Sequence, residues 1–260
     1  MSNIKNAFTN GKAFIGFVTG GDPCIEKTKE FVMEMIRAGA DLIEIGIPFS
    51  DPIAEGAVIQ EANIRALRGG ALRSGATVEK LFTLVEDLRK VTAIPLVFLT
   101  YYNPVFHYGC DSFFERAAAA GLDGIIIPDL PFEEQAPVKK AAGKYGIDLI
   151  SLIAPTSEAR IKEIATAASG FIYVVSSMGV TGVRSKITTD VASIVKSIKQ
   201  VTEIPAAIGF GIHTPEQAAE MAQIADGVIV GSAIVKIIAE HGDAAGKYIY
   251  EYVKEMKEAI

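Results

Sequence analysis

The chain has 260 residues, of which half are hydrophobic, and its formal net charge is −6. That hydrophobic fraction is ample for a sizeable core, and the acidic balance argues against a surface that binds duplex nucleic acid. Two cysteines without paired spacing argue against a disulfide framework and favour a reducing compartment, which we take to be the cytoplasm.

The two most apolar segments do not have the properties of secretion or membrane signals. Residues 13–18 form a run too short for a signal sequence, and Thr-Gly-Gly-Asp-Pro follows it in place of a small-residue cleavage site. The tract at 227–238 is interrupted by Ser232 and Lys236, so it is not a membrane span. The sequence therefore predicts a soluble cytoplasmic protein.

Short apolar runs alternate with helical segments after a short polar helix at 2–10. The runs are apolar on both faces, which is typical of buried parallel strands. Strands are expected at 13–19, 41–47, 94–100, 124–128, 148–153, 171–176, 205–209 and 227–230. Helices are expected at 26–38, 58–67, 77–90, 111–120, 133–145, 157–168, 189–199 and 215–223, and from the last strand to the C-terminus.

Eight such units in this length predict an α/β protein with a single (β/α)8 TIM barrel over residues 1–260, with extra N-terminal and loop helices. A doubly wound open sheet is the alternative. That fold usually carries a glycine-rich dinucleotide turn after its first strand, whereas the turn here reads Gly20-Gly21-Asp22-Pro23. The sequence favours the barrel, whose functional residues lie at the C-terminal ends of the strands.

A carboxylate interrupts the second apolar run. Alternation places Leu42, Glu44 and Gly46 on one face, so Glu44 points into a core if both faces are covered. Burial raises the pKa of a carboxyl group, and a raised pKa suits a general acid near neutral pH. The alternative is a structural carboxylate paired with an arginine or with backbone amides. We predict that Glu44 is catalytic and works with Glu55, which ends the following loop.

Glycine-rich turns follow the last three expected strands. Gly182, Gly211 and the pair Gly231-Ser232 are positions where bare backbone can approach a ligand closely. Ser232 also opens a helix, and helix N-termini attract anions. Barrels often hold phosphate in the loops after strands seven and eight. The pattern predicts a phosphate site, with simple tight turns as the alternative.

Several residue types are missing where other chemistries need them. No lysine lies within an expected strand, which argues against a Schiff-base aldolase. The histidines are scattered without ligand spacing, so we expect no metal, and neither a dinucleotide fingerprint nor a nucleophile elbow is present. What remains is acid–base chemistry by carboxylates on a small phosphate ester.

Motifs along the whole chain resemble those of the tryptophan synthase alpha subunit family. They are GFVTGGDP (16–23), LIEIGIPFSDPIAEGAVIQ (42–60), YYNPVF (101–106), IPDLPFEE (127–134), SSMGVTGVR (176–184), GFGI (209–212) and GSAIVK (231–236). The resemblance implies a lyase of tryptophan biosynthesis that splits indole-3-glycerol phosphate into indole and glyceraldehyde 3-phosphate by a retro-aldol reaction. It implies no cofactor on this chain. The implied partner is a beta subunit with its own pyridoxal phosphate, in an alpha-beta-beta-alpha heterotetramer.

The resemblance also implies residue roles. Glu44 would protonate the indole C3 carbon and help to remove the proton of the departing glycerol hydroxyl, and Glu55 would steady the indole N–H as positive charge develops. Substrate binding is implied for Tyr173, Thr181, Gly182, Phe210, Gly211, Gly231 and Ser232, mostly through backbone contacts to the phosphate. The surface that faces the beta subunit is implied to include Pro48, Asp51 and Asn103.

The chain departs from the family pattern in two places. The family motif reads Asp-Gly-Pro where this chain has Glu55-Gly56-Ala57, and residues 68–75 resemble a small tandem insertion. A carboxylate misplaced by about 1 Å can cost about a hundredfold in rate, and loss of the proline loosens the loop. Two other functions stay open: a weakly active or inactive barrel that activates a beta subunit, and another phosphate-binding barrel enzyme such as a sugar-phosphate isomerase.

Overall fold

The computed structural model describes residues 2–69, 75–175, 184–209 and 211–260, with the side chains of all of these except 184–190. Eight parallel strands form a closed barrel in which each strand pairs with the next along the chain and β8 pairs with β1. The strands are β1 Ala13–Thr19, β2 Leu42–Gly46, β3 Leu96–Leu99, β4 Gly124–Ile126, β5 Asp148–Ile153, β6 Ile172–Val175, β7 Ala206–Gly209 and β8 Gly227–Val230. Closure confirms the barrel and excludes the open sheet.

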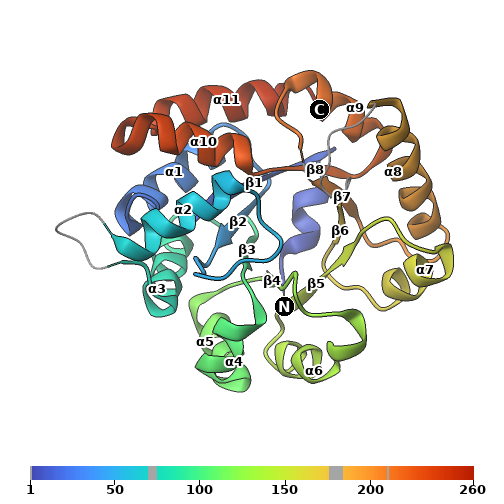
Figure 1. Ribbon diagram of the computed structural model, residues 1–260, viewed down its shortest axis with the longest axis horizontal. Helices are drawn as coiled ribbons and strands as arrows, with labels where there is room; N and C mark the ends of the chain where they lie inside the picture. Colours follow the sequence, from blue (N-terminus) through green and yellow to red (C-terminus); the bar gives the residue numbers. More distant parts are fainter. Residues whose placement is uncertain (1, 70–74, 176–183, 210) are drawn as a thin grey trace.

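Helices cover the outside of the barrel (Figure 1). The α-helices are α1 Ile25–Arg37, α2 Ala57–Arg68, α3 Val78–Arg89, α4 Tyr102–Tyr108, α5 Cys110–Ala120, α6 Ala136–Lys144, α7 Glu158–Thr166, α8 Arg184–Lys199, α9 Pro215–Ile224, α10 Ser232–His241 and α11 Gly246–Glu258. Three short 3₁₀ helices are η1 Ile4–Phe8, η2 Phe132–Glu134 and η3 Gly242–Ala244. Alternate residues of each strand therefore face either these helices or the barrel interior.

Helix α4 is an element that the sequence patterns did not predict. It begins directly after β3, and its Pro104 lies in the first turn, where a missing backbone N–H costs no helical hydrogen bond. The Tyr102 amide donates instead to the Asp129 carboxylate at 2.9 Å. One long helix expected at 133–145 is present as η2 and α6, because Pro137 favours a helix start at that point.

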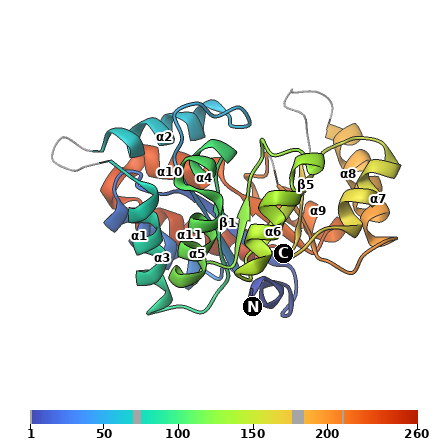
Figure 2. The ribbon, with the colours of Figure 1, turned by 90° about the horizontal axis from the view of Figure 1, so that it is seen from below.

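The N-terminal helix η1 closes the bottom of the barrel. Its Ile4 and Ala7 are buried in the cluster of side chains that fills the interior, and Phe8 packs against Phe171 with ring centroids 6.0 Å apart. The sequence predicted a short polar helix here, and the structure shows that this helix has an apolar side that closes the barrel interior. In Figure 2 it lies at the lower edge, opposite α2 and the loop that precedes it.

A buried carboxylate fastens this helix to the barrel. Asp123 accepts hydrogen bonds from the backbone amides of Asn3 at 2.8 Å and Leu96 at 2.9 Å, and it forms an ion pair with Arg89. Arg89 also donates to the Gly121 carbonyl at 2.7 Å. Helix η1, helix α3 and strand β3 therefore all depend on one side chain, and the C-terminal ends of the strands are left for the functional site.

Replacement of Asp123 by alanine is expected to lower the free energy of unfolding by about 3 kcal/mol, because Arg89 and the two amides lose a buried partner. Urea denaturation measures the effect. Asp111→Ala is the matched control, since it breaks an exposed ion pair with Lys144 and should cost less than about 1 kcal/mol. Equal costs for the two variants would contradict this role of Asp123.

Candidate active site

Glu44 lies on the inward face of β2 and is 1% exposed. It pairs in register with Phe17 of β1 and Val97 of β3, and its Oε1 atom has no hydrogen-bond partner among the described residues. This disfavours the alternative of a structural carboxylate held by an arginine or by amides. Burial raises the pKa of Glu44 from 4.5 to about 8, so the group carries a proton at neutral pH.

Tyr173 shares the barrel interior with Glu44. It lies on β6, and a β-carbon added to Gly209 of the adjacent β7 would lie 2.4 Å from its hydroxyl oxygen, so only glycine leaves room for the ring. Burial raises the pKa of Tyr173 well above its ordinary value, and the negative charge of Glu44 adds to the effect. The structure therefore brings these two predicted site residues together.

Glu55 lies at the end of the β2–α2 loop and is half-buried. Its Oε2 atom accepts a hydrogen bond from Asn63 Nδ2 at 2.6 Å. Burial raises the pKa of Glu55, while hydrogen bonds from Asn63 and Tyr101 act in the opposite direction. The second acid is therefore not a solvated loop residue, as a glutamate in a loop usually is, but a half-buried carboxylate held by the Asn63 amide.

The expected phosphate residues are described in part. Gly211 has a φ of +81°, which favours glycine, and its carbonyl is 2.8 Å from His213 Nδ1. Gly231 precedes α10, whose N-terminus, beginning at Ser232, has no side-chain cap. Backbone amides at such a helix end suit an anion. The remaining residues of this expected group lie outside the described residues: Thr181, Gly182 and Phe210.

The ring of Phe17 connects the two halves of the site. A β-carbon added to Gly46 of β2 would lie 2.8 Å from this ring, and one added to Gly231 would lie 3.3 Å from it. Phe17 thus lies between the strand that carries Glu44 and the start of α10. Its position two residues before the end of β1, in register with Glu44, is the sequence signal that marks it.

Two further polar residues were missed. Thr19, at the end of β1, is fully buried, and its hydroxyl has no hydrogen-bond partner among the described residues. Asn63 lies on the buried stripe of α2 with Ala62 and Ala66. A polar residue on an otherwise small and apolar helical stripe is a signal comparable to that of Glu44 on its strand. Thr19 carries no comparable signal and is a candidate only through its position in the fold.

The expected partner surface is uneven. Asp51 and Asn103 are exposed, but Pro48 is buried in the free chain. Ile53 on the β2–α2 loop is 78% exposed and Phe106 on α4 is 67% exposed, the most exposed of the large hydrophobic side chains. Apolar side chains at this end of the barrel therefore accompany the two predicted polar contacts.

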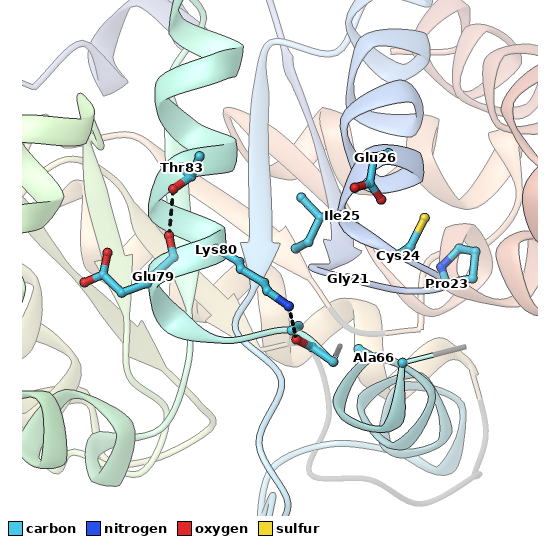
Figure 3. Close-up of a pocket in the computed structure, with 12 residues that line it drawn as sticks. Gly21, Pro23, Cys24, Ile25, Glu26, Ala66, Glu79, Lys80 and Thr83 are labelled. Atoms are coloured by element: carbon cyan, nitrogen blue, oxygen red, sulfur yellow. Dashed lines mark hydrogen bonds between the residues drawn. The ribbon is translucent and has the colours of Figure 1, made fainter. Parts of the chain in front are cut away.

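A cavity of about 490 Å³ lies apart from these residues, between the first turns of α1 and α3 and the end of α2 (Figure 3). Lys80 at its wall donates to the Gly75 carbonyl at 2.8 Å. Glu44, Tyr173 and Glu55 do not line it. In the described part of the chain no group of three His, Cys, Asp or Glu side chains could hold a metal ion. No helix there is long and apolar enough to cross a bilayer.

The fold and the site define a (β/α)8-barrel enzyme with a protonated acid in its interior. A family model described as tryptophan synthase alpha chain matches residues 2–260. The tryptophan synthase alpha chain of Lacticaseibacillus casei is 49% identical over 260 residues, covering 100% of this chain and 96% of that one. That of Lactiplantibacillus plantarum is 50% identical over 261 residues, covering 100% and 97%.

Solved structures of tryptophan synthase alpha chains are also similar to this chain. The crystal structure of the alpha chain from Legionella pneumophila has a TM-score of 0.88 and 34% identity, covering 100% of this chain and 97% of that one. A chain of the tryptophan synthase complex from Pyrococcus furiosus has a TM-score of 0.83 and 33% identity, covering 95% and 99%. The chain belongs to the tryptophan synthase alpha chain family.

The buried acid makes stability depend on pH. Because the pKa of Glu44 is about 8 in the fold against 4.5 as its ordinary value, the folded state binds the proton more tightly, and stability falls as pH rises between these values. Glu44→Gln should remove this loss, so the variant should gain on the order of 3 kcal/mol over the parent between pH 5 and pH 8. Urea denaturation at both pH values measures the gain. Parallel curves for the two proteins would contradict it.

Proposed function

We propose that this chain is the alpha-subunit lyase that cleaves indole-3-glycerol phosphate to indole and glyceraldehyde 3-phosphate in tryptophan biosynthesis. The observation that carries the proposal is the buried acid of Glu44 at the inward face of β2, whose Oε1 atom has no hydrogen-bond partner in the described part of the chain. An acid that keeps its proton near pH 7 suits a reaction that begins with proton transfer to carbon. Membership of the family supports the same activity.

In the proposed mechanism Glu44 donates its proton to C3 of the indole ring, and positive charge moves to the ring nitrogen. The bond between C3 and the adjacent glycerol carbon then breaks, while the hydroxyl on that carbon returns a proton to the Glu44 carboxylate. The bonding electron pair restores the aromatic ring, and the glycerol carbon becomes an aldehyde. One carboxyl group thus acts first as acid and then as base, so protons balance without another group.

The other site residues take roles that match their surroundings. The ionised Glu55 carboxylate steadies the indole N–H while the ring is positive, and Tyr173 lines the ring pocket. The phosphate lies at the N-terminus of α10, on the backbone of Gly231 and Ser232 and beside Gly211. Thr181, Gly182 and Phe210 belong to the same proposal, although they lie outside the described residues.

We further propose that the chain acts with a beta subunit in an alpha-beta-beta-alpha complex. The tryptophan synthase of Pyrococcus furiosus forms an a2b2 complex, and one of its chains is similar to this one. The exposed Ile53 and Phe106, with Asp51 and Asn103, offer an apolar surface with a polar edge for that partner. Pro48, which is buried, would support this surface from beneath.

The proposed chemistry uses carboxylates alone, so the chain needs no cofactor, and pyridoxal phosphate belongs to the beta subunit. Cys24 and Cys110 do not form a disulfide, which supports a reducing compartment such as the cytoplasm. The carboxylate mechanism also makes a definite claim about pH. The reaction needs protonated Glu44, so its rate should fall as pH rises through about 8.

Release of indole from indole-3-glycerol phosphate tests this function, measured for the chain alone and with a beta subunit across pH 6–10. We expect turnover that declines above pH 8 and that Glu44→Gln lowers by about a thousandfold or more, because a general acid contributes up to about 10⁴-fold. Substrate binding, measured by calorimetry, should be retained in the variant.

Absence of indole in both settings would reject the lyase and leave the chain as a binding partner. The role as a binding partner would then be tested by the effect of this chain on the rate of the reaction that the beta subunit catalyses. A Glu44→Gln variant that keeps most of its rate would reject Glu44 as the proton donor, whatever the activity of the parent.

The length of the side chain at position 55 gives a separate prediction. Glu55→Asp withdraws the carboxylate from Asn63 by about one methylene, and a shift of about 1 Å can cost up to a hundredfold in rate. We therefore expect kcat to fall about tenfold or more in the indole assay. A faster variant would show that the site is limited by the reach of the longer side chain.

A further inference from the structure

We propose that Asn63 and Tyr101 are positioning residues that aim the Glu55 carboxylate at the substrate. This inference deepens the proposed function and rests on it. Asn63 lies on helix α2 and Tyr101 directly precedes helix α4, so the loop that ends in Glu55 is fixed from two rigid elements.

Helix α2 reaches back to residue 55 with two side chains. Gln60 Nε2 donates to the Glu55 carbonyl at 2.7 Å, and Asn63 Nδ2 donates to the Glu55 carboxylate at 2.6 Å. Positions three apart lie on one face of a helix, so both amides point toward the preceding loop. Asn63 is 3% exposed, and an amide buried to this extent is placed by packing rather than by solvent.

Tyr101 contacts the loop segment that ends in the same carboxylate. Its hydroxyl oxygen accepts a hydrogen bond from the Ala54 amide at 3.0 Å, which leaves its own proton available to Glu55, whose pKa this hydroxyl lowers. The side chain is 1% exposed, and its ring packs on Phe49 with centroids 5.4 Å apart. Tyr101 thus fixes the backbone just before Glu55.

The helix that carries Asn63 is itself anchored. Two residues further on, Arg65 makes a two-pronged ion pair with Asp22 in the β1–α1 loop, at 2.9 and 2.8 Å. Next to Asn63, Ala62 is buried against Phe17 and Val235. Translation or rotation of α2 would break both contacts. Asn63 therefore has a fixed position relative to the barrel that does not depend on the conformation of the loop.

The two donors also set the charge of Glu55. Burial raises its pKa, and the hydrogen bonds from Asn63 and Tyr101 lower it. Tyr101 is the titratable group that faces Glu55, and burial raises its pKa to about 12, with further contributions from Glu55 and Asp129, so it remains a donor. Loss of either donor should leave Glu55 protonated at higher pH, where it cannot steady a cation.

The test uses the chain with its beta subunit and compares Asn63→Ala, Tyr101→Phe and Glu55→Gln singly and in pairs. Each donor variant should lower kcat about tenfold or more, with a smaller change in KM, and should move the acidic limb of the kcat/KM profile to higher pH. In the Glu55→Gln background the same substitutions should have little further effect, because the group they act on is gone. Tyr108→Phe is the matched control, since it removes an outer Tyr–Glu79 hydrogen bond and should leave all rates unchanged.

If the donor substitutions lower kcat by the same factor in the Glu55→Gln background as in the parent, the inference is overturned, because Asn63 and Tyr101 would then act independently of Glu55. Unchanged pH limbs in both donor variants would overturn it as well. If Asn63→Ala gives little folded protein, Tyr101→Phe carries the same cycle, since it removes a single oxygen atom. Failure of the parent protein to release indole would reject the proposed function instead, so the two failures are distinguishable.

Discussion

A neutral carboxyl group inside an apolar barrel is the interaction on which the rest of the site depends. Strand β2 is paired on both sides, so Glu44 cannot turn toward solvent without breaking the closed sheet. Desolvation opposes its charge, and the backbone pairing of the barrel holds it there against that cost. The free energy of folding in this way keeps Glu44 protonated near neutral pH, which is the state that proton transfer to carbon requires.

Glu44 and Glu55 differ in the contacts that set their positions and their pKa values. Glu44 is set by strand register, and its Oε1 atom has no hydrogen-bond partner among the described residues, so burial opposes its charge. Glu55 accepts a hydrogen bond from Asn63, and hydrogen bonding opposes the effect of burial on its pKa. The same residue type is thus placed in two different environments. The proposed reaction needs this difference, since one group must give a proton while the other stabilises a cation.

Periodicity was sufficient to predict most of the fold. Continuous apolar runs identified the eight strands, and Glu44 was visible because its charge breaks such a run. The failures were local: α4 was not predicted, and the helix at 2–10 was expected to be polar although Ile4 and Ala7 of η1 are buried in the barrel interior. Asn63 was missed because its role depends on a contact between a helix and a loop, and spacing along one element does not encode such a contact.

Because α2 is anchored, changes within the helix and changes in length after it should have different effects on Glu55. Gln60 and Asn63 of the helix contact Glu55, and the ion pair of Arg65 with Asp22 fixes the helix closer to its C-terminal end. Inserted or deleted residues after Arg68 therefore need not shift the catalytic loop, because the Arg65–Asp22 ion pair fixes the helix between them. The sequence repeat at 68–75 lies beyond this ion pair, so a protein of this architecture can acquire or lose residues there while the placement of its second acid is conserved. A helix fixed in this way allows the loop that follows it to vary in length while the geometry of the active site is retained.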